Sequence, residues 1–127
     1  MRKEQILALR PEIPQAEINH GISEIEQFQN NTLRPIIKFQ HEIILSIFSS
    51  FVRKIHKDWG SISNEKKTVI VENVLSKNQQ IKNNYTGIIG GLMSLEEFEF
   101  YQLNVSKINR RISQIIKQRI QTNLADL

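Results

Sequence analysis

The sequence predicts an all-α protein, in which residues 1–127 form a single-domain bundle of four or five mostly antiparallel helices. Hydrophobic residues recur every three or four positions through most of the chain, which is the spacing of one helix face. No stretch alternates with period two between turn residues, so we predict no strand. With only 3 prolines and 5 glycines in 127 residues, few positions are obliged to form loops. The short connections favour antiparallel neighbouring helices, and a chain of this length can bury a hydrophobic core without disulfides or a structural metal.

The first predicted segment is a short amphipathic helix over residues 2–9, which ends before Pro11 and Pro14. A longer helical pattern begins near Gln15. Its apolar positions follow at intervals of three or four: Ile18, Ile22, Ile25 and Phe28. This pattern leads into an apolar segment that contains Pro35.

The segment from Ile36 to Ile55 is predicted to be a long central helix. At 100° per residue, its apolar side chains cover far more than the roughly 100° stripe of a surface helix, so we expect neighbours on several sides. Pro35 falls on the narrow polar side, where water can satisfy the carbonyl that loses its donor. We therefore expect a proline kink in a continuous helix. The alternative is a break at residues 30–31, with Thr32 as N-cap and Pro35 in the first turn of a new helix.

The stretch "KDWGSISNEKK" predicts the first clear break after this helix, with Ser61 or Ser63 as the cap of the next one. A helix then extends to about Leu75, and the polar stretch "SKNQQ" separates it from another apolar face over residues 81–92. Finally, "SLEE" is a capping box, with Ser94 as N-cap and Glu97 reaching back to it. The last helix continues with apolar residues at heptad spacing, which are Phe98, Tyr101, Val105, Ile108, Ile112 and Ile115.

The amino-acid composition excludes several classes of protein. The chain contains no cysteine, which excludes disulfides, thiolate metal sites and a cysteine nucleophile, and which fits a cytoplasmic protein. No run of about 18 apolar residues predicts a membrane span. The only apolar run near the start, "ILAL", is too short for a signal peptide. We therefore expect a soluble cytoplasmic protein with no membrane partner.

The sequence contains no motif that identifies an enzyme. A Glu-x-x-His pair, as in di-iron bundles, occurs once, at Glu17 and His20, and is not repeated before His41 or His56. There is no Gly-x-Ser-x-Gly elbow. "GIIGG" lacks the lysine and the preceding strand of a phosphate-binding loop. It predicts either a smooth patch at Gly87 and Gly91, where another helix can approach closely, or a helix end at residues 90–91. We expect no metal, no cofactor and no catalytic residue.

Five polar residues form a candidate polar pocket: Arg34, Gln40, His41, Tyr101 and Asn109. The first three occur within the apolar arc of the central helix or at its edge, and Asn109 lies inside that of the last helix, as does Arg119. A buried amide or guanidinium is costly unless it is hydrogen-bonded, so each needs a partner. One interpretation is a pocket of a ligand-binding protein or an enzyme, in which Arg34 holds an anion. The other is a structural network that fixes helix register, with Arg34 bonded to carbonyls near Pro35.

The last helix also contains a candidate partner surface. Phe100 and Leu103 fall opposite its apolar seam and beside Lys107 and Arg111. An aromatic and an aliphatic residue three positions apart can form a contact patch. Association with a second copy, or with another protein, is therefore our main functional hypothesis.

The net charge of +4 is unevenly distributed, and the last helix is rich in basic residues. No acid occurs between Gln102 and Ala125, whereas the same stretch contains Lys107, Arg110, Arg111 and Lys117. These residues could contact nucleic-acid phosphates, and such binding would weaken steeply with salt. The alternative is that basic residues close a helix because its dipole favours them there.

Three stretches also resemble a known group of proteins: "FQNNTLRPIIKFQ", "TGIIGG" and "EEFEFYQLN" followed by "INRRI". The group consists of short, all-helical bacterial proteins of unestablished function, some of which carry the label glyoxalase. The resemblance covers most of the chain and matches Phe28, Asn30, Leu33, Arg34, Pro35, Gly87, Tyr101 and Arg111. It implies an all-helical fold and no known mechanism. Glyoxalase I enzymes use strands with His and Glu metal ligands, and glyoxalase II enzymes a His-rich di-metal motif. This sequence has neither, so we do not expect that activity.

Overall fold

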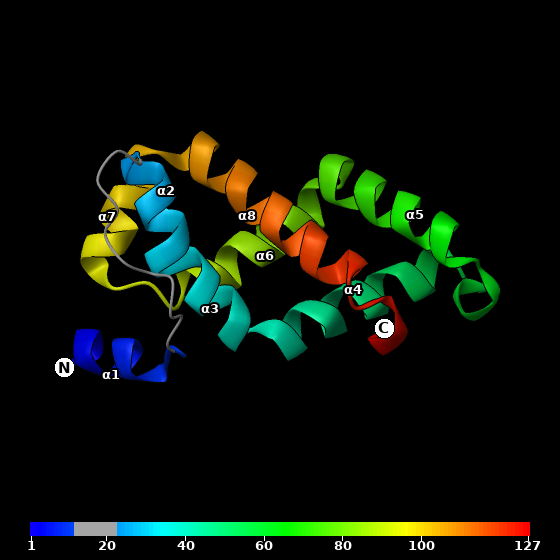
Figure 1. The fold of residues 1–127 in the computed structure, drawn as a ribbon, viewed down its shortest axis with the longest axis horizontal. Coiled ribbons are helices and arrows are strands. Elements are labelled where there is room, and N and C mark those ends of the chain that lie inside the picture. The colour runs from blue at the N-terminus through cyan, green and yellow to red at the C-terminus, as the bar shows by residue number, and fades with distance from the viewer. Residues whose placement is uncertain (12–22) are drawn as a thin grey trace.

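The computed structural model describes residues 1–11 and 23–127, and within these ranges all regular structure is helical and no strand occurs (Figure 1). The predicted α class is therefore confirmed. The α-helices are α1 (Arg2–Leu9), α2 (Glu24–Phe28), α3 (Arg34–Phe39), α4 (His41–Ile55), α5 (Asn64–Lys77), α6 (Gln79–Gly90), α7 (Leu95–Leu103) and α8 (Val105–Gln121). A π-helical segment, η1 (Gln29–Leu33), joins α2 to α3, and η2 (Trp59–Ser61) and η3 (Leu124–Asp126) are short 3-10 turns. In this part of the chain, no helix is both long and apolar enough to span a bilayer.

Helix α8 lies at the centre of the described structure and packs against α4, α5, α6 and η1 (Figure 1). Its isoleucines recur every three or four residues, so they share one face that is removed from water. Ile108, Ile112, Ile116 and Ile120 are all buried on it. The helix also brings the C-terminus back beside α4, where Arg53 donates a 2.9 Å hydrogen bond to the carbonyl oxygen of Leu127.

The segment predicted to be the central helix contributes a large part of the core. Ile36, Ile44 and Phe48 are completely buried, as the prediction required. However, Phe39 and Ile43 are exposed, so neighbours cover one side of this segment and not its whole apolar arc. The central position belongs to α8 instead.

The predicted count of four or five helices and the predicted proline kink are not matched. The backbone stays helical through Pro35, and the irregularity precedes it. In η1 the turns widen, and the Arg34 N–H donates to the carbonyl of Gln29, five residues earlier. Such a π-turn accommodates a local disturbance of the hydrogen-bond ladder and shifts the phase of all residues around it. Pro35 is buried and Arg34 is exposed, the reverse of the wheel prediction.

Two further breaks divide the predicted long helices. Gln40, with φ −89° and ψ 10°, separates α3 from α4. Asn104, with φ −137° and ψ 34°, separates α7 from α8, and its side chain donates a 3.0 Å hydrogen bond to the Phe100 carbonyl. The predicted heptad seam therefore does not run through one helix, and Val105 is exposed.

The structure confirms the helix caps that the sequence predicts most strongly. Ser63 caps α5, and Ser94 and Glu97 form the predicted capping box at the start of α7. Helix α6 ends at Gly90, as "GIIGG" indicated, and a Cβ at Gly90 would lie 3.5 Å from the Phe98 ring. The predicted Ile18 and Ile22 positions, and the Glu17–His20 pair, lie outside the described residues.

Candidate functional site: two polar clusters, a groove and an exposed helix face

The five residues of the predicted polar pocket lie in three different places. Gln40 donates a 3.2 Å hydrogen bond to the carbonyl of Ile88, and so ties the α3–α4 junction to α6. Tyr101 donates to Asn109 Oδ1 at 2.6 Å and links α7 to α8. These three residues thus form hydrogen bonds between helical segments. Arg34 and His41 lie elsewhere, beside Arg119.

Arg34, His41 and Arg119 form what we call the cationic cluster, where α3 and α4 approach the last turns of α8. Arg119 Nη1 lies 3.0 Å from His41 Nδ1. Arg34 and Arg119 line a common cavity of about 290 Å³. Burial and the neighbouring charge of Arg34 both lower the pKa of Arg119, because each disfavours the cationic form.

The cationic cluster has no carboxylate partner in residues 1–11 and 23–127. Neither Arg34 nor Arg119 takes part in an ion pair there, and the buried Nε of Arg119 has no hydrogen-bond acceptor. Glu42 and Asp126 line a neighbouring cavity together with His41, without pairing with either arginine. A partly buried guanidinium without a carboxylate is unusual, because burial of an uncompensated charge is costly.

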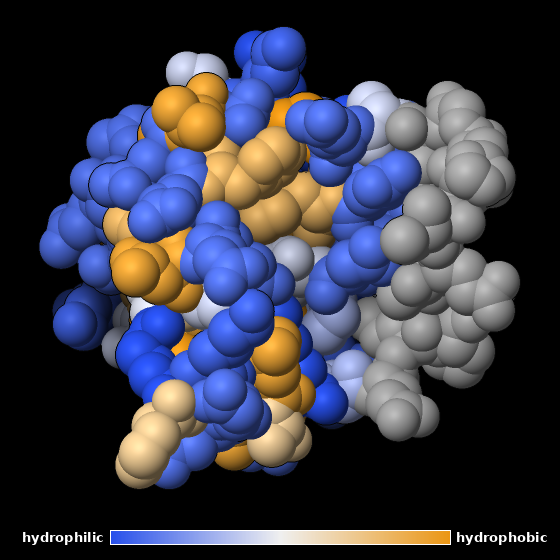
Figure 2. All heavy atoms as spheres, turned by 90° about the vertical axis from the view of Figure 1, so that its left-hand side faces the viewer, coloured by the Kyte–Doolittle hydropathy of each residue, from blue (hydrophilic) through white to orange (hydrophobic). Residues whose placement is uncertain are grey.

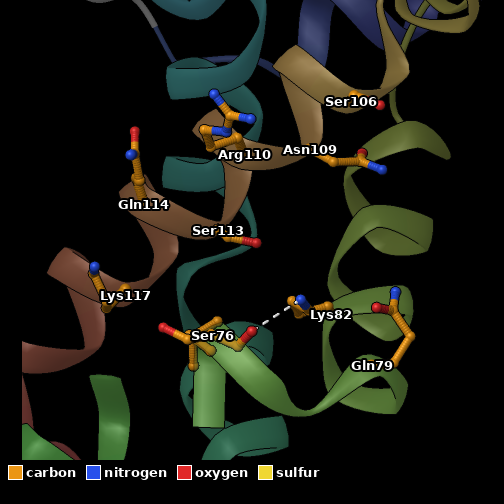
Figure 3. Close-up of a pocket in the computed structure, with 10 residues that line it drawn as sticks. Ser76, Gln79, Lys82, Ser106, Asn109, Arg110, Ser113, Gln114 and Lys117 are labelled. Atoms are coloured by element: carbon orange, nitrogen blue, oxygen red, sulfur yellow. Dashed lines mark hydrogen bonds between the residues drawn. The ribbon is translucent and has the colours of Figure 1, made fainter. Parts of the chain in front are cut away.

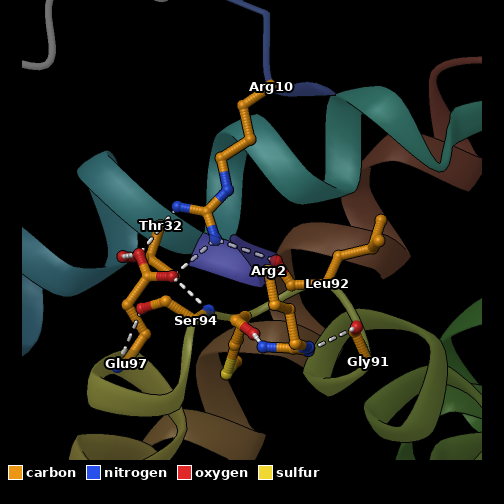
Figure 4. A network of polar contacts seen from close by, with 8 residues as sticks. Arg2, Arg10, Thr32, Gly91, Leu92, Ser94 and Glu97 are labelled. Carbon is orange, nitrogen blue, oxygen red and sulfur yellow. Dashed lines mark hydrogen bonds and ion pairs between the residues drawn. The ribbon is translucent and has the colours of Figure 1, made fainter. Parts of the chain in front are cut away.

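A second cluster, the Arg10–Glu97 network, joins α1 to the start of α7 (Figure 4). Arg10 Nη1 donates to Glu97 Oε2 at 2.7 Å, and its other terminal nitrogen donates to Glu97 and to the Leu92 carbonyl. Thr32 Oγ1 also donates to Glu97 Oε2, at 2.8 Å. The Arg10 and Glu97 side chains are only 9% and 19% exposed. Sequence reasoning found Glu97 through the capping box but had no signal for Arg10.

The electrostatics of Glu97 follow from these contacts. Burial by itself raises the pKa of this carboxyl, but hydrogen bonds from Arg10, from the Ser94 N–H and from Thr32 outweigh it and lower the pKa to about 2. Arg2 reinforces the same junction, because its guanidinium donates to the carbonyls of Met93 and Gly91 at 2.8 and 3.2 Å (Figure 4). The network is therefore a compensated clamp that holds the N-terminal helix.

A polar groove of about 530 Å³ lies between α8 and the α5–α6 junction (Figure 3). Three basic side chains, Lys82, Arg110 and Lys117, line it together with serines and amides. Lys117 already pairs with Glu72 at 2.9 Å, and Lys82 donates to the Ser76 carbonyl at 3.2 Å. This arrangement leaves Arg110 as the basic group of the groove for which no protein contact is found among the described residues.

The predicted partner surface is divided. Leu103, at the end of α7, is 84% exposed, and Lys107 is exposed in the first turn of α8. Phe100 instead packs on Phe28, with ring centroids 4.9 Å apart. Arg111 donates a 2.8 Å hydrogen bond to Gln29 Oε1. Phe100 and Arg111 thus attach α7 and α8 to the α2–η1 segment, and only Leu103 and Lys107 remain available to a partner.

The end of the molecule that contains α1 and α7 has a mixed surface. Apolar side chains lie between hydrophilic ones on this face (Figure 2). Leu95, which is 68% exposed, and the exposed Val105 belong to the same region of the chain as Leu103. No group of three or more His, Asp or Glu residues with metal-binding geometry occurs in the described ranges.

Comparison with models of known protein families, with curated proteins and with solved structures finds no match to this chain. The function must therefore be inferred from the surfaces and clusters described above.

Proposed function

We propose that this chain is a non-catalytic helical-bundle module of the cytoplasm, which associates with a second copy of itself through the α7 surface. We define this surface as Leu95, Glu99, Leu103, Val105 and Lys107. The observation that carries the proposal is the exposure of Leu103, which is the most exposed aliphatic side chain among those of leucine, isoleucine and valine in the described residues. Burial of such a side chain against a partner removes apolar area from water.

The charges of the α7 surface favour a second copy of the same chain. Glu99 lies on α7 one turn before Leu103, and Lys107 lies in the first turn of α8, after the break at Asn104. A two-fold axis near Leu103 would bring Glu99 of each copy towards Lys107 of the other, because the same patch is used by both copies in an isologous dimer. Opposite charges at the rim of an apolar contact favour that register.

The area of α7 alone is too small for a stable dimer. A nine-residue helix is only about 13 Å long, whereas stable interfaces bury about 800 Å² on each partner. Helix α1 lies at the same end of the molecule (Figure 1), and its residues Leu7 and Leu9 are exposed. The Arg10–Glu97 network holds α1 there, so the two helices can form one larger surface.

The test is sedimentation velocity over a range of protein concentrations. We expect a concentration-dependent dimer for the wild type and a monomer for Leu103→Glu, because the substitution places a charge in the apolar contact. Val69→Glu is the matched control, since Val69 is 59% exposed on α5 and lies outside the α7 surface. It should dimerise as the wild type does. A wild type that stays monomeric at its highest soluble concentration would contradict the proposal.

Charge reversal tests the two-fold register. Glu99→Lys and Lys107→Glu should each weaken the homodimer, because like charges then meet across the axis. An equimolar mixture of the two variants should restore association, since both pairs across the axis then have opposite charges, one of them with reversed sign. If the mixture associates no better than the separate variants, the register is wrong even where dimerisation itself is observed.

Nucleic-acid binding by α8 is a second hypothesis with less support from the contacts. Of the four basic residues predicted for it, Arg111 bonds Gln29 and Lys117 pairs with Glu72. Phosphate contacts would have to replace these bonds or depend on Lys107 and Arg110. The absence of binding to a duplex at low salt would remove this hypothesis, because the electrostatic term is strongest there.

A further inference from the structure

The cationic cluster is the feature that the self-association proposal does not use. Its cavity of about 290 Å³ is lined by Arg34 from α3, by Ile115, Gln118 and Arg119 of α8, and by Thr122 and Asn123 after it. This volume is at the lower end of the roughly 300–1,000 Å³ of small-ligand sites. Two guanidinium groups and two side-chain amides therefore line a space that a small molecule can enter.

The charge of this cavity is not balanced by the protein residues that the structure describes. Arg34 and Arg119 repel each other, and neither has a carboxylate within ion-pair distance in residues 1–11 and 23–127. The buried Nε of Arg119 also lacks an acceptor. An anion in the cavity would compensate both charges and could accept hydrogen bonds from both guanidinium groups.

The contact between Arg119 and His41 is also compatible with an anion in the cavity. A guanidinium has only donors, so the 3.0 Å contact requires His41 Nδ1 to accept, which gives a neutral imidazole with its hydrogen on Nε2. His41 thus holds one terminal nitrogen of Arg119 without neutralising its charge. The rest of the guanidinium keeps donors for another acceptor.

The C-terminus of helix α8 lies beside the cavity, and it repels an anion less strongly than an uncapped helix C-terminus would. Free carbonyls in a last turn carry partial negative charge. Here the Arg119 carbonyl accepts hydrogen bonds from Asn123 Nδ2 at 2.7 Å and from Thr122 Oγ1 at 3.1 Å. The carbonyl of Arg119 is therefore hydrogen-bonded within the protein.

We propose that the cationic cluster binds a small oxyanion, namely the phosphate or carboxylate group of a small molecule, between Arg34 and Arg119. Planar guanidinium groups match both kinds of oxyanion in a bidentate manner. The site lies outside the α7 surface, so it can be occupied whether or not the chain dimerises.

The test uses inorganic phosphate and acetate as separate probes at constant ionic strength, with chloride as the reference salt. We expect phosphate, acetate or both to raise the melting temperature of the wild type above that in chloride, because a ligand that binds only the folded state stabilises it. Protection by phosphate alone identifies a phosphate site, and stronger protection by acetate identifies a carboxylate site. Equal melting temperatures in all three salts would overturn the proposal.

Three variants locate the binding. Arg119→Met and Arg34→Met should each weaken the affinity for the protecting anion at least about tenfold, the effect of losing a charge-assisted hydrogen bond. Arg34 is exposed, so its variant keeps the test valid if Arg119→Met folds poorly. Arg110→Met removes the same charge from the other side of α8, at the groove of Figure 3, and should bind as the wild type does. Equal weakening by Arg110→Met would show that binding follows net charge, and would overturn the proposal.

Discussion

Two arginines of this protein, Arg10 and Arg119, are both at least partly buried but have opposite surroundings. The terminal nitrogens of Arg10 donate to a carboxylate and to a backbone carbonyl. The observed terminal contact of Arg119 is to the imidazole of His41, and the other charged residue that lines the cavity is another arginine. The Nε of each lacks a partner, so the difference lies in the terminal groups and in the net charge around them.

This difference separates a structural contact from a candidate binding site. A compensated pair holds two helices together, and removal of one member leaves the other charge buried. A partly buried cation without a carboxylate contributes no such attraction, and it destabilises the folded protein until an anion binds to it. The two regions should therefore respond in opposite ways to the same kinds of substitution.

The largest effect is expected for Glu97→Ala. It leaves Arg10 without its carboxylate and removes the capping box of α7, so the free energy of unfolding should fall by about 3–5 kcal/mol. Urea unfolding measures this loss. Glu96→Ala is the control, because among the described residues Glu96 forms an exposed pair with Lys3, and its loss should lower the free energy of unfolding far less. Similar losses for the two variants would mean that the network is not a buried clamp.

The next comparison replaces each arginine with methionine in phosphate-free buffer. Arg10→Met should lower the free energy of unfolding by about 3 kcal/mol, because Glu97 loses its main charged partner. Arg119→Met should change it by less than about 1 kcal/mol or raise it, since an unpaired charge is replaced by an apolar side chain. Both values come from urea unfolding under the same conditions. Equal destabilisation would remove the contrast between the two regions.

The pH dependence of stability sharpens the same contrast. The pKa of Glu97 is lowered from its ordinary 4.5 to about 2 in the folded protein. Below pH 4.5 the unfolded chain binds the proton more readily, so the contribution of Glu97 is complete above that pH and is lost progressively as the pH falls towards 2. Between pH 5 and pH 2, the melting temperature of the wild type should therefore fall more steeply with decreasing pH than that of Glu97→Gln. Parallel profiles would contradict the assigned contacts.

The smallest effect is expected for the pair that joins α7 to α8 without charge. Tyr101→Phe removes the hydrogen bond to Asn109 Oδ1 and should cost about 1 kcal/mol, the usual net value of a neutral hydrogen bond. Phosphate binding should be unaffected, because Tyr101 is not part of the cationic cluster. Urea unfolding and the anion-dependent melting temperature check the two halves of this prediction. A change in anion protection would mean that the predicted pocket residues act together after all.

Much of the local structure could be predicted because its causes are local. The capping box at Ser94 and Glu97, the cap at Ser63 and the end of α6 at Gly90 all depend on neighbours within four residues. The prediction was wrong for the course of the chain through Pro35 and through Asn104. A helical wheel assumes 100° per residue throughout. The π-helical η1 and the break at Asn104 each change the angle between the side chains that precede them and those that follow.

The candidate site was only partly predictable for the same reason. The sequence marked Arg34, His41 and Arg119 as polar groups in or near apolar arcs, but it also grouped them with Tyr101 and Asn109, which pair with each other elsewhere. Which polar residue meets which partner depends on the crossing of helices that are distant along the chain. The link from Arg10 to Glu97 spans 87 positions, and no local pattern encodes it.

The sequence by itself determined the helical class, the strongest caps and the isoleucine face of α8, because hydrophobic period and side-chain capping act over one or two turns. Only the tertiary structure decided that α8 is the central helix, that one arginine meets a carboxylate and that another meets a second arginine. Those outcomes depend on packing between segments far apart in the chain. There, the burial of apolar faces fixes the position of each polar group, whether or not the group then finds a partner of opposite charge.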